Sequence, residues 1–288
     1  MSTRKVWFIT GANAGFGRSM LECAIRKGDT VVAAVRRPET MTKLQTEYTE
    51  DRLLVVKVDV SKSDQVNAAF DTVKKTFGRI DVVYNNAGYG IVGEVEAVPL
   101  EAARAVFETN YWGLVYVTRA AVAFFREVNQ PQGGRLLQVS SMYAESADGC
   151  VGYYSGTKHA ANALTEALSK ELDPAWNIKP TLIEAGYYKT DSVKLKSFEM
   201  YGHPSYTNPA VEGVAIRQAF ANLDPNNTPF IRGDPDKLSE VVYRVTDMED
   251  PPLWLPLGKD AYVRARAKIA SYLADIDKYE SLSDDLEL

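Results

Sequence analysis

The sequence has few of the residues that build metal sites. Among 288 residues there are two cysteines, Cys23 and Cys150, and two histidines, His159 and His203. The cysteines lie far apart and lack metal-ligand spacing, so we predict no metal site. Cys23 falls in a helical pattern and is expected to be a small core residue. Cys150 could border a pocket, but nothing around it makes it a nucleophile.

Long apolar runs and an excess of basic charge are also missing. The apolar run at residues 6–10 is too short to cross a membrane, and the first residues are polar. We therefore expect no membrane span, no signal peptide and a cytoplasmic location. A formal net charge of −5 argues against a nucleic-acid partner. With 45% hydrophobic and 25% charged residues, the chain can bury a full core.

Predicted strands and helices alternate along the chain. The strands are expected at residues 6–10, 31–35, 53–58, 80–85, 135–140, 179–184 and 253–257. The helices are expected at 15–27, 62–77, 100–129, 152–172, 208–222 and 259–279. This order predicts an α/β protein with a single-domain Rossmann fold over residues 1–288: a doubly wound parallel seven-stranded sheet with helices on both faces. Residues 224–236 are expected to form an exposed loop, and 281–288 a frayed tail.

A glycine-rich turn follows the first predicted strand. The strand enters Gly11-Ala-Asn-Ala-Gly15-Phe-Gly17, and a helical pattern follows. Strand, glycine turn and helix form the layout of a dinucleotide site, because glycines let the backbone approach a pyrophosphate and the helix start offers free N–H groups. Glycines also serve plain tight turns, so the position at the start of a βαβ unit is what supports this interpretation.

Two arginines end the second predicted strand. An acidic residue there would accept a hydrogen bond from the ribose 2′-hydroxyl of NAD, but the chain has Arg36 and Arg37. Two cations suit a 2′-phosphate, which arginine binds with a planar fork. We therefore predict NADP(H) as the cofactor, with Arg36 the stronger candidate. The alternative is that both arginines are ordinary solvated loop charges.

A tyrosine and a lysine stand four residues apart. Tyr154 and Lys158 would share one face of a helix, with Ser141 thirteen residues upstream. An ammonium group beside a phenol favours the phenolate, so we expect the Tyr154 pKa to fall from about 10. Such a group can exchange a proton with an alcohol or ketone oxygen. A chance pair on a solvated helix is the alternative, and the spacing alone does not exclude it.

A fourth predicted strand runs into Asn85-Asn86-Ala87-Gly88. Asn86 could brace neighbouring strands through its amide, and Ala87 and Gly88 would leave room for the adenosine ribose. A plain exit from strand to turn is the alternative, since asparagine and glycine are common turn residues.

Together these segments resemble the short-chain dehydrogenase/reductase family over nearly the whole chain. The motifs concerned are Thr10-Gly11-x3-Gly15-x-Gly17, Asn85-Asn86-Ala87-Gly88, Asn110, Ser141 and Tyr154-x3-Lys158. The likeness is to its compact, NADP-preferring form, and residues 253–261 resemble the hydroxysteroid-dehydrogenase-like branch. The family usually has proline at the position of Ala185 and, in some NADP-preferring members, a basic residue at Ala14, so the NADP prediction depends on the two arginines.

The resemblance implies roles for individual residues. The implied cofactor-binding residues are Gly11, Asn13, Gly15, Phe16, Gly17, Arg36, Arg37, Asp59, Val60, Asn86, Ala87, Gly88, Tyr154, Lys158, Gly186, Tyr188 and Thr190. The implied catalytic residues are Asn110, Ser141, Tyr154 and Lys158. Ser141 and Tyr154 would hydrogen-bond a carbonyl oxygen, Lys158 would bond the nicotinamide ribose, and Asn110 would hold a water that reloads the proton. Alternatively, Asn110 kinks its helix and satisfies backbone groups.

The predicted substrate region is an insertion at residues 191–230. We interpret it as an apolar lid over a hydrophobic carbonyl or alcohol substrate, although a surface helix pair that packs its own aromatics would give the same composition. The candidate substrate contacts are Tyr143, Cys150, Tyr187, Phe198, Met200 and Tyr201.

Other functions stay open at this point. A non-catalytic NADP-binding regulator could use the same fold, as could an isomerase or a dehydratase. A homodimer or homotetramer could form through helices 100–129 and 152–172, which often pair subunits in this family. The apolar positions cited for that face are Phe107, Leu114, Val117, Phe124 and Phe125.

Overall fold

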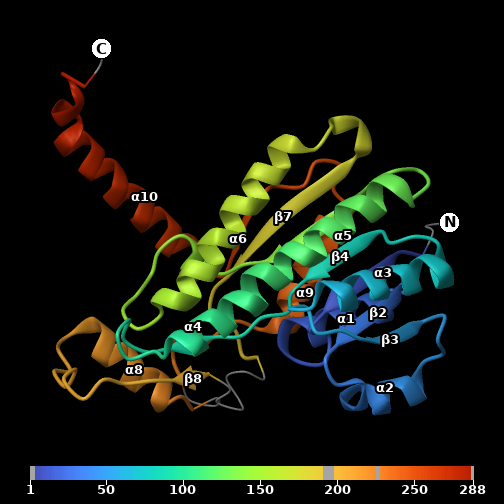
Figure 1. The fold of residues 1–288 in the computed structure, drawn as a ribbon, viewed down its shortest axis with the longest axis horizontal. Coiled ribbons are helices and arrows are strands. Elements are labelled where there is room, and N and C mark those ends of the chain that lie inside the picture. Colours follow the sequence, from blue (N-terminus) through green and yellow to red (C-terminus); the bar gives the residue numbers. More distant parts are fainter. Residues whose placement is uncertain (1–3, 191–197, 225–227, 287–288) are drawn as a thin grey trace.

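The computed structural model describes residues 4–190, 198–224 and 228–286 (Figure 1). Its main sheet has seven parallel strands in the order β3-β2-β1-β4-β6-β7-β9. The strands are β1 Val6–Thr10, β2 Thr30–Val35, β3 Leu53–Lys57, β4 Val82–Asn85, β6 Gly134–Val139, β7 Ile178–Ala185 and β9 Trp254–Leu257. The predicted α/β Rossmann fold is confirmed, and each strand boundary moves by two residues or fewer.

The central strands are largely apolar because helices cover both faces of the sheet. Every residue of β1 and β2 is buried. Alternate side chains face opposite layers, so Trp7 and Ile9 join one core cluster while Val6 and Phe8 join the other. The first layer contains α1 (Gly15–Arg26), α2 (Thr42–Glu47) and α9 (Pro235–Val245). The second contains α3 (Ser63–Phe77), α5 (Gly113–Glu127) and α6 (Gly152–Glu171).

Helix α9 was not predicted, and it takes the last two residues of the predicted loop 224–236, whose other described residues lie outside the helices and strands. Its first residue is Pro235, and the side chain of Asp234 caps it by accepting from the backbone N–H groups of Asp236 and Lys237. Aspartate before proline is a helix-start signal that the sequence already contained. Its apolar face packs on α1, through Leu238 and Val242.

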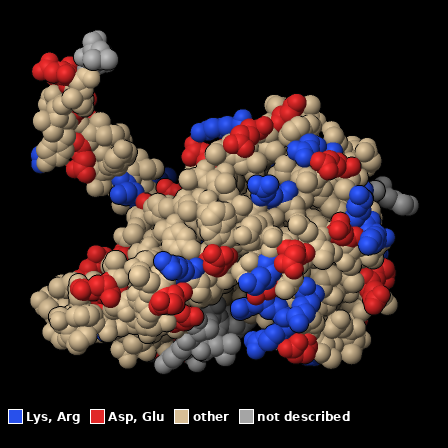
Figure 2. All heavy atoms as spheres, viewed as in Figure 1, with Lys and Arg blue, Asp and Glu red and all other residues tan. Residues whose placement is uncertain are grey.

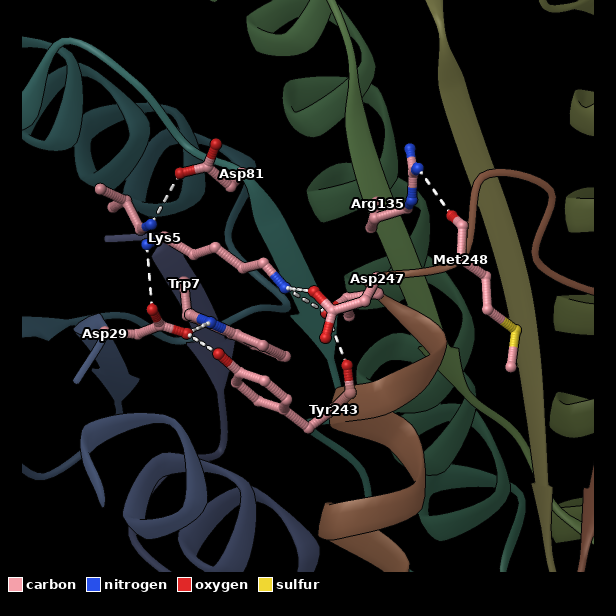
Figure 3. A network of polar contacts seen from close by, with 10 residues as sticks. Lys5, Trp7, Asp29, Asp81, Arg135, Tyr243, Asp247 and Met248 are labelled. Carbon is pink, nitrogen blue, oxygen red and sulfur yellow. Dashed lines mark hydrogen bonds and ion pairs between the residues drawn. The ribbon is translucent and has the colours of Figure 1, made fainter. Parts of the chain in front are cut away.

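A polar network at the amino ends of the strands anchors α9 to the sheet (Figure 3). Asp29 is 5% exposed and accepts hydrogen bonds from Trp7 Nε1 at 2.9 Å and from the Tyr243 hydroxyl at 2.8 Å. Its other carboxylate oxygen accepts from the backbone N–H of Lys5 at 3.0 Å. Lys5 Nζ donates in turn to Asp247, just beyond α9. The network therefore links the start of the chain to a helix more than two hundred residues later.

The predicted helix 100–129 is two helices joined by a π-helical turn. Helix α4 covers Leu100–Phe107, the turn covers Glu108–Trp112, and α5 follows. Five apolar residues were predicted to form a face between subunits, and four of them are buried in the subunit itself: Leu114, Val117, Phe124 and Phe125. These side chains are covered within the subunit and do not support subunit pairing, which stays a prediction.

The segment after β7 crosses to the loop after β4. Strands β5 (Ile91–Val92) and β8 (Glu199–Met200) form a small parallel sheet, and α8 covers Glu212–Ala221, shorter than the predicted 208–222. Residues 191–197 and 225–227 of the predicted lid lie outside the described residues.

Helix α10 (Lys259–Tyr279) projects away from the body, and a short 3-10 turn (Glu280–Ser283) continues it into the predicted tail (Figure 1). Residues 287–288 of that tail lie outside the described residues. Across the described ranges, no helix is both long enough and apolar enough to span a membrane.

Candidate active site

The candidate site lies at the carboxyl ends of the strands, where the strand order reverses between β1 and β4. Ligands of open α/β sheets bind at such a switch point. A cavity of about 990 Å³ opens there. The predicted site residues that line it are Gly11, Asn13, Gly15, Phe16, Arg36, Arg37, Asp59, Val60, Asn86, Ala87, Gly88, Ser141, Tyr143, Tyr154, Lys158, Gly186, Tyr187, Tyr188, Thr190 and Phe198. Gly17, Asn110, Cys150, Met200 and Tyr201 are not among the lining residues.

The glycine turn leaves no room for side chains. Gly11 and Gly15 have φ values of +64° and +53°, in the left-handed region that favours glycine. Gly17 does not line the cavity, but a Cβ there would lie 2.3 Å from the carbonyl oxygen of Gly11 and 2.7 Å from Asn86 Nδ2. Gly17 therefore allows α1 to start directly against the turn, where its N-terminus faces the cavity.

Asn86 braces β1 against β4. Its Nδ2 donates to the carbonyl oxygen of Thr10 at 2.9 Å, and its backbone N–H donates to Thr10 Oγ1 at 2.8 Å. The N–H of Ala87 reaches the same hydroxyl at 2.9 Å. The loop after β4 is thus fixed to the glycine turn, and the two form one continuous wall of the cavity.

Arg36, Arg37 and the turn after β3 lie at the opposite end of that wall. Arg36 and Arg37 are exposed, and neither forms an ion pair with an acidic side chain of the described ranges. Asp59 accepts hydrogen bonds from the backbone N–H of Ser61 at 3.0 Å and from Ser61 Oγ at 2.8 Å, which fixes the turn after β3. The arginines therefore keep their full capacity to bind an anion.

Ser141, Tyr154 and Lys158 come together from two elements. Ser141 follows β6, and the other two residues lie one turn apart on α6. Ser141 and Tyr154 both line the cavity, and Ser141 Oγ accepts a hydrogen bond from the backbone N–H of Tyr143 at 3.2 Å. Lys158 Nζ donates to the carbonyl oxygen of Val139 at 2.8 Å and lies 5.8 Å from the centroid of the Tyr154 ring.

The pKa of Tyr154 differs from the predicted direction. Burial raises it, the hydrogen bond with Ser141 lowers it in part, and Tyr187 adds a smaller rise. Burial also lowers the pKa of Lys158, to about 8. The prediction considered the charge of the lysine but not the removal of both groups from water, which opposes ionisation of each.

Asn110 lies in the π-helical turn and is 1% exposed. Its Oδ1 accepts from the backbone N–H of Tyr89 at 3.0 Å, and its Nδ2 donates to the Tyr89 carbonyl at 2.9 Å. Nδ2 also lies 3.3 Å from Thr157 Oγ1, one residue before Lys158. The amide therefore joins the loop after β4 to α6, as the backbone-satisfying alternative expected. A single-turn π-bulge is itself frequent at functional sites.

A carboxyl pair, the buried Glu184 and the half-buried Glu145, lies behind Ser140. Asn162 Nδ2 donates to Glu184 at 2.8 Å and to Glu145 at 3.1 Å, while Asn162 Oδ1 accepts from Ser140 Oγ at 2.6 Å. Burial raises the pKa of Glu184 to about 8, and the hydrogen bond with Glu145 adds to the rise. Sequence reasoning missed this network, because no motif marks residues from three separate elements.

Aromatic side chains form the wall opposite the glycine turn. Tyr143 and Tyr187 share a hydrogen bond between their hydroxyls at 2.5 Å, and Tyr143 also donates to Asp148. Asp148 is held in turn by an ion pair with Arg264, in the second turn of α10. Tyr143 and Tyr187 were predicted as substrate contacts. The lining residues missed on this side are Tyr89, Ile91, Val92, Met142, Val151, Phe220, Leu223 and Ile231.

Three predicted substrate contacts lie behind this wall or outside it. Cys150 has a φ of +63°, is 7% exposed and donates from Sγ to the carbonyl oxygen of Gly213. Met200 is exposed on β8, and Tyr201 packs against Ile91 in a separate cluster. Burial raises the pKa of the Cys150 thiol to about 11, which makes it a weak nucleophile. In the part of the chain that the structure describes, no three His, Cys, Asp or Glu side chains could hold a metal ion.

The family model of the short chain dehydrogenases matches residues 5–199. The chain belongs to this family. An oxidoreductase of Botryotinia fuckeliana is 33% identical over 280 residues, covering 97% of this chain and 98% of that protein. A crystal structure of a short-chain dehydrogenase from Streptomyces avermitilis, 31% identical, superposes with a TM-score of 0.86 and covers 99% of this chain and 100% of the other.

The likeness to the hydroxysteroid dehydrogenases is narrower. An 11-beta-hydroxysteroid dehydrogenase of Sesamum indicum is 30% identical over 233 residues, 79% of this chain and 62% of that protein. Membership of the short-chain dehydrogenase family is therefore supported over nearly the whole chain. The hydroxysteroid-dehydrogenase-like branch is supported over a smaller part of it.

Proposed function

We propose that this protein is an NADP(H)-dependent oxidoreductase that interconverts a hydrophobic ketone or aldehyde and the corresponding alcohol. The observation that carries the proposal is the meeting of Ser141, Tyr154 and Lys158 at the junction of the two cavity walls. One wall is glycine-rich and ends in two arginines that form no ion pair with a described acidic residue. The other is aromatic and apolar.

The glycine wall fits a dinucleotide. Gly11 and Gly15 line the cavity without side chains and with φ values that favour glycine, so a ligand can approach the backbone of the turn closely. Arg36 and Arg37 would hold the 2′-phosphate of NADP(H), and the start of α1 would face the pyrophosphate. Lys158 would donate to the nicotinamide ribose while it keeps its bond to Val139.

The chemistry follows from the position of the hydroxyls. When bound, the reduced nicotinamide supplies a hydride for the carbonyl carbon. Tyr154 donates its proton to the carbonyl oxygen, which Ser141 holds with a second hydrogen bond, and the product is the alcohol. Tyr154 remains protonated until that step because burial raises its pKa. Lys158 Nζ lies 5.8 Å from the centroid of the Tyr154 ring and is the group past which a replacement proton would reach the phenol. Asn110 holds α6 in place through Thr157.

The aromatic wall fits an apolar substrate. Phe198 and Phe220 pack edge to face with ring centroids 5.2 Å apart, and Leu223 and Ile231 close the same side. Phe198, Phe220 and Leu223 come from the described part of the 191–230 segment, and Ile231 follows it directly. We propose that this segment is the lid of the pocket. Such a surface gains free energy by covering hydrocarbon, so the substrate class is a carbonyl compound with an apolar body.

A panel of aldehydes, ketones and steroids, assayed with NADPH and NADH in parallel, tests the proposal. We expect turnover with NADPH and a lower KM for NADPH than for NADH. In Arg36→Ala the KM for NADPH should rise about 10- to 100-fold while the KM for NADH stays, because charge-assisted hydrogen bonds to the phosphate are lost.

The matched control is Arg126→Ala, an arginine on α5 outside the cavity lining. Equal effects of Arg36→Ala on the two cofactors would contradict the NADP assignment. Binding of NADPH without turnover on the whole panel would favour a regulator, and turnover without net oxidation of NADPH would favour an isomerase or dehydratase.

A further inference from the structure

Helix α10 carries an apolar stripe that nothing in the described subunit covers. Tyr262, Ile269 and Ile276 follow one another at intervals of seven, and Tyr272 and Tyr279 repeat with the same interval. Ile269 is 58% exposed and Tyr272 is 64% exposed. Among the residues of this helix, Ala261 alone is buried. Figures 1 and 2 show the helix standing clear of the body.

The seven-residue interval is that of a coiled coil. With Tyr262, Ile269 and Ile276 at the first core position, Ala265, Tyr272 and Tyr279 occupy the second, over three heptads. A continuous stripe of exposed apolar side chains gains nothing from contact with water and marks a surface for a partner. The pattern therefore calls for a second helix of similar length.

The charges on α10 indicate which helix is its partner. The first half has four basic residues against one acidic residue, Asp260, and the second half has Asp275 and Asp277 against one basic residue, Lys278. Two copies of the same helix placed antiparallel bring the basic half of each against the acidic half of the other. A parallel pair would set like charges level with one another.

We propose that α10 pairs antiparallel with α10 of a second copy of this chain, around a two-fold axis between Ala270 and Ser271. Ile269 then packs against Tyr272 of the second copy, Tyr262 against its Tyr279, and Ala265 against its Ile276. At the edge of this seam Lys268 lies opposite Asp275 of the second copy. Every contact occurs twice, as a two-fold interface requires.

The base of α10 is fixed to the body and keeps the helix in position for this pairing. Asp260 accepts from the backbone N–H of Tyr187 at 2.6 Å, and Arg264 forms an ion pair with Asp148. The stripe begins at Tyr262, on the side that these anchors leave exposed. The proposal uses no feature of the cofactor site and is independent of the proposed activity.

A membrane surface is the other occupant that an amphipathic helix suggests. Helices that lie on membranes have a polar face rich in lysine and arginine, which faces anionic lipid headgroups. In α10 that face turns acidic toward the free end, at Asp275, Asp277 and Glu280. The same lipid surface would repel this half of the helix, so the charges favour a second copy of the chain.

Light scattering on the purified full chain tests the pairing. The wild type should have at least twice the mass of one chain at micromolar concentration, and Ile269→Asp should halve that mass with unchanged helical content. Ala274→Asp, on the side of α10 away from the stripe, is the matched control and should leave the mass unchanged. A monomeric wild type, or an Ile269→Asp variant with the full mass, would overturn the proposal.

Charge reversal tests the antiparallel arrangement. Lys268→Glu and Asp275→Lys should each raise the dissociation constant of the dimer about tenfold, because each sets like charges opposite one another. The double variant should bring it back to within about threefold of the wild type. Failure of this rescue would refute the antiparallel register. Binding to vesicles of phosphatidylcholine and phosphatidylserine by a wild type that stays monomeric would replace the second copy by a membrane.

Discussion

The two ends of the central sheet use the same kinds of residue in opposite ways. At the amino ends, the charged side chains are paired: Asp29 accepts three hydrogen bonds, and Lys5 meets Asp247 (Figure 3). At the carboxyl ends, Arg36 and Arg37 line a cavity without an ion pair to any described acidic residue. Charges at the first end hold the fold together, and those at the second are available to a ligand.

This difference predicts that stability and activity separate along the strands. A change at the amino ends should lower the free energy of unfolding and leave the chemistry intact. A change at the carboxyl ends should lower the activity and leave the free energy of unfolding nearly unchanged. The variants below test the separation at individual residues of either end.

The largest effect is expected from Tyr154→Phe at the carboxyl ends. The hydroxyl that donates the proton is lost, so kcat should fall about 10³-fold, as is typical for removal of a general acid. The ring still packs on its neighbours, so the Tm should be unchanged. The dissociation constant for NADPH, measured by fluorescence titration, should stay within a factor of two or three of the wild-type value. Turnover within about tenfold of the wild type would remove Tyr154 from the mechanism.

The next effect concerns Asp29→Ala at the amino ends. The variant leaves the buried Trp7 Nε1–H and the Tyr243 hydroxyl without their acceptor, which should cost about 3 kcal/mol in the free energy of unfolding. Denaturant unfolding measures this loss, while kcat/KM at 25 °C should remain that of the wild type. Asp247→Ala removes an exposed partner of Lys5 and should cost less than about 1 kcal/mol. A catalytic defect in a stably folded Asp29→Ala variant would contradict the separation.

Much of this division could be predicted from the sequence, because it depends on local patterns. Buried parallel strands are continuous apolar runs, and the glycine turn and the Tyr154–Lys158 pair are short motifs at the ends of such runs. For this reason the predicted strand boundaries differ from the observed ones by at most two residues. Helix α9 could also have been found, since Asp234-Pro235 is a local start signal.

The parts that were missed depend on contacts between distant segments. Strand β5 pairs with β8 more than one hundred residues later, and each is two residues long, too short to show a period. Phe220 and Ile231 reach the cavity because of how α8 and the following loop pack, not because of their spacing. The rise in the Tyr154 pKa has the same origin, since burial depends on the whole fold.

A smaller effect on binding is expected from Gly17→Ala. The added methyl would lie 2.3 Å from the Gly11 carbonyl oxygen, so the turn must shift, and the affinity for NADPH should fall about 100-fold. Gly28→Ala is the matched control: its φ is +97° but its surroundings are open, so it should cost about 1 kcal/mol of stability without loss of affinity. Equal affinities in the two variants would show that close backbone approach at the turn is not required.

The smallest effect on activity is expected from Glu184→Gln, which tests whether the separation extends beneath the site. Burial raises the pKa of Glu184 from 4.5 in the unfolded chain to about 8 in the folded protein. Folding therefore favours the protonated carboxyl. Its contribution to stability is complete below pH 4.5 and is lost as the pH rises through 8.

Glutamine resembles the protonated form, so below pH 4.5 the variant and the wild type should have nearly equal free energies of unfolding. Between pH 4.5 and 8 the unfolded wild type ionises Glu184 while the folded protein keeps it protonated, so the variant should become the more stable of the two, and the difference should level off above pH 8. Urea unfolding at pH 4, 5, 6, 7 and 8 measures the divergence, with Glu166→Gln, a partly exposed residue that pairs with Lys170 on α6, as the control. Parallel pH profiles for all three proteins would mean that Glu184 is ionised in the folded state, and that the carboxyl ends of the strands tolerate a buried charge without a counterion.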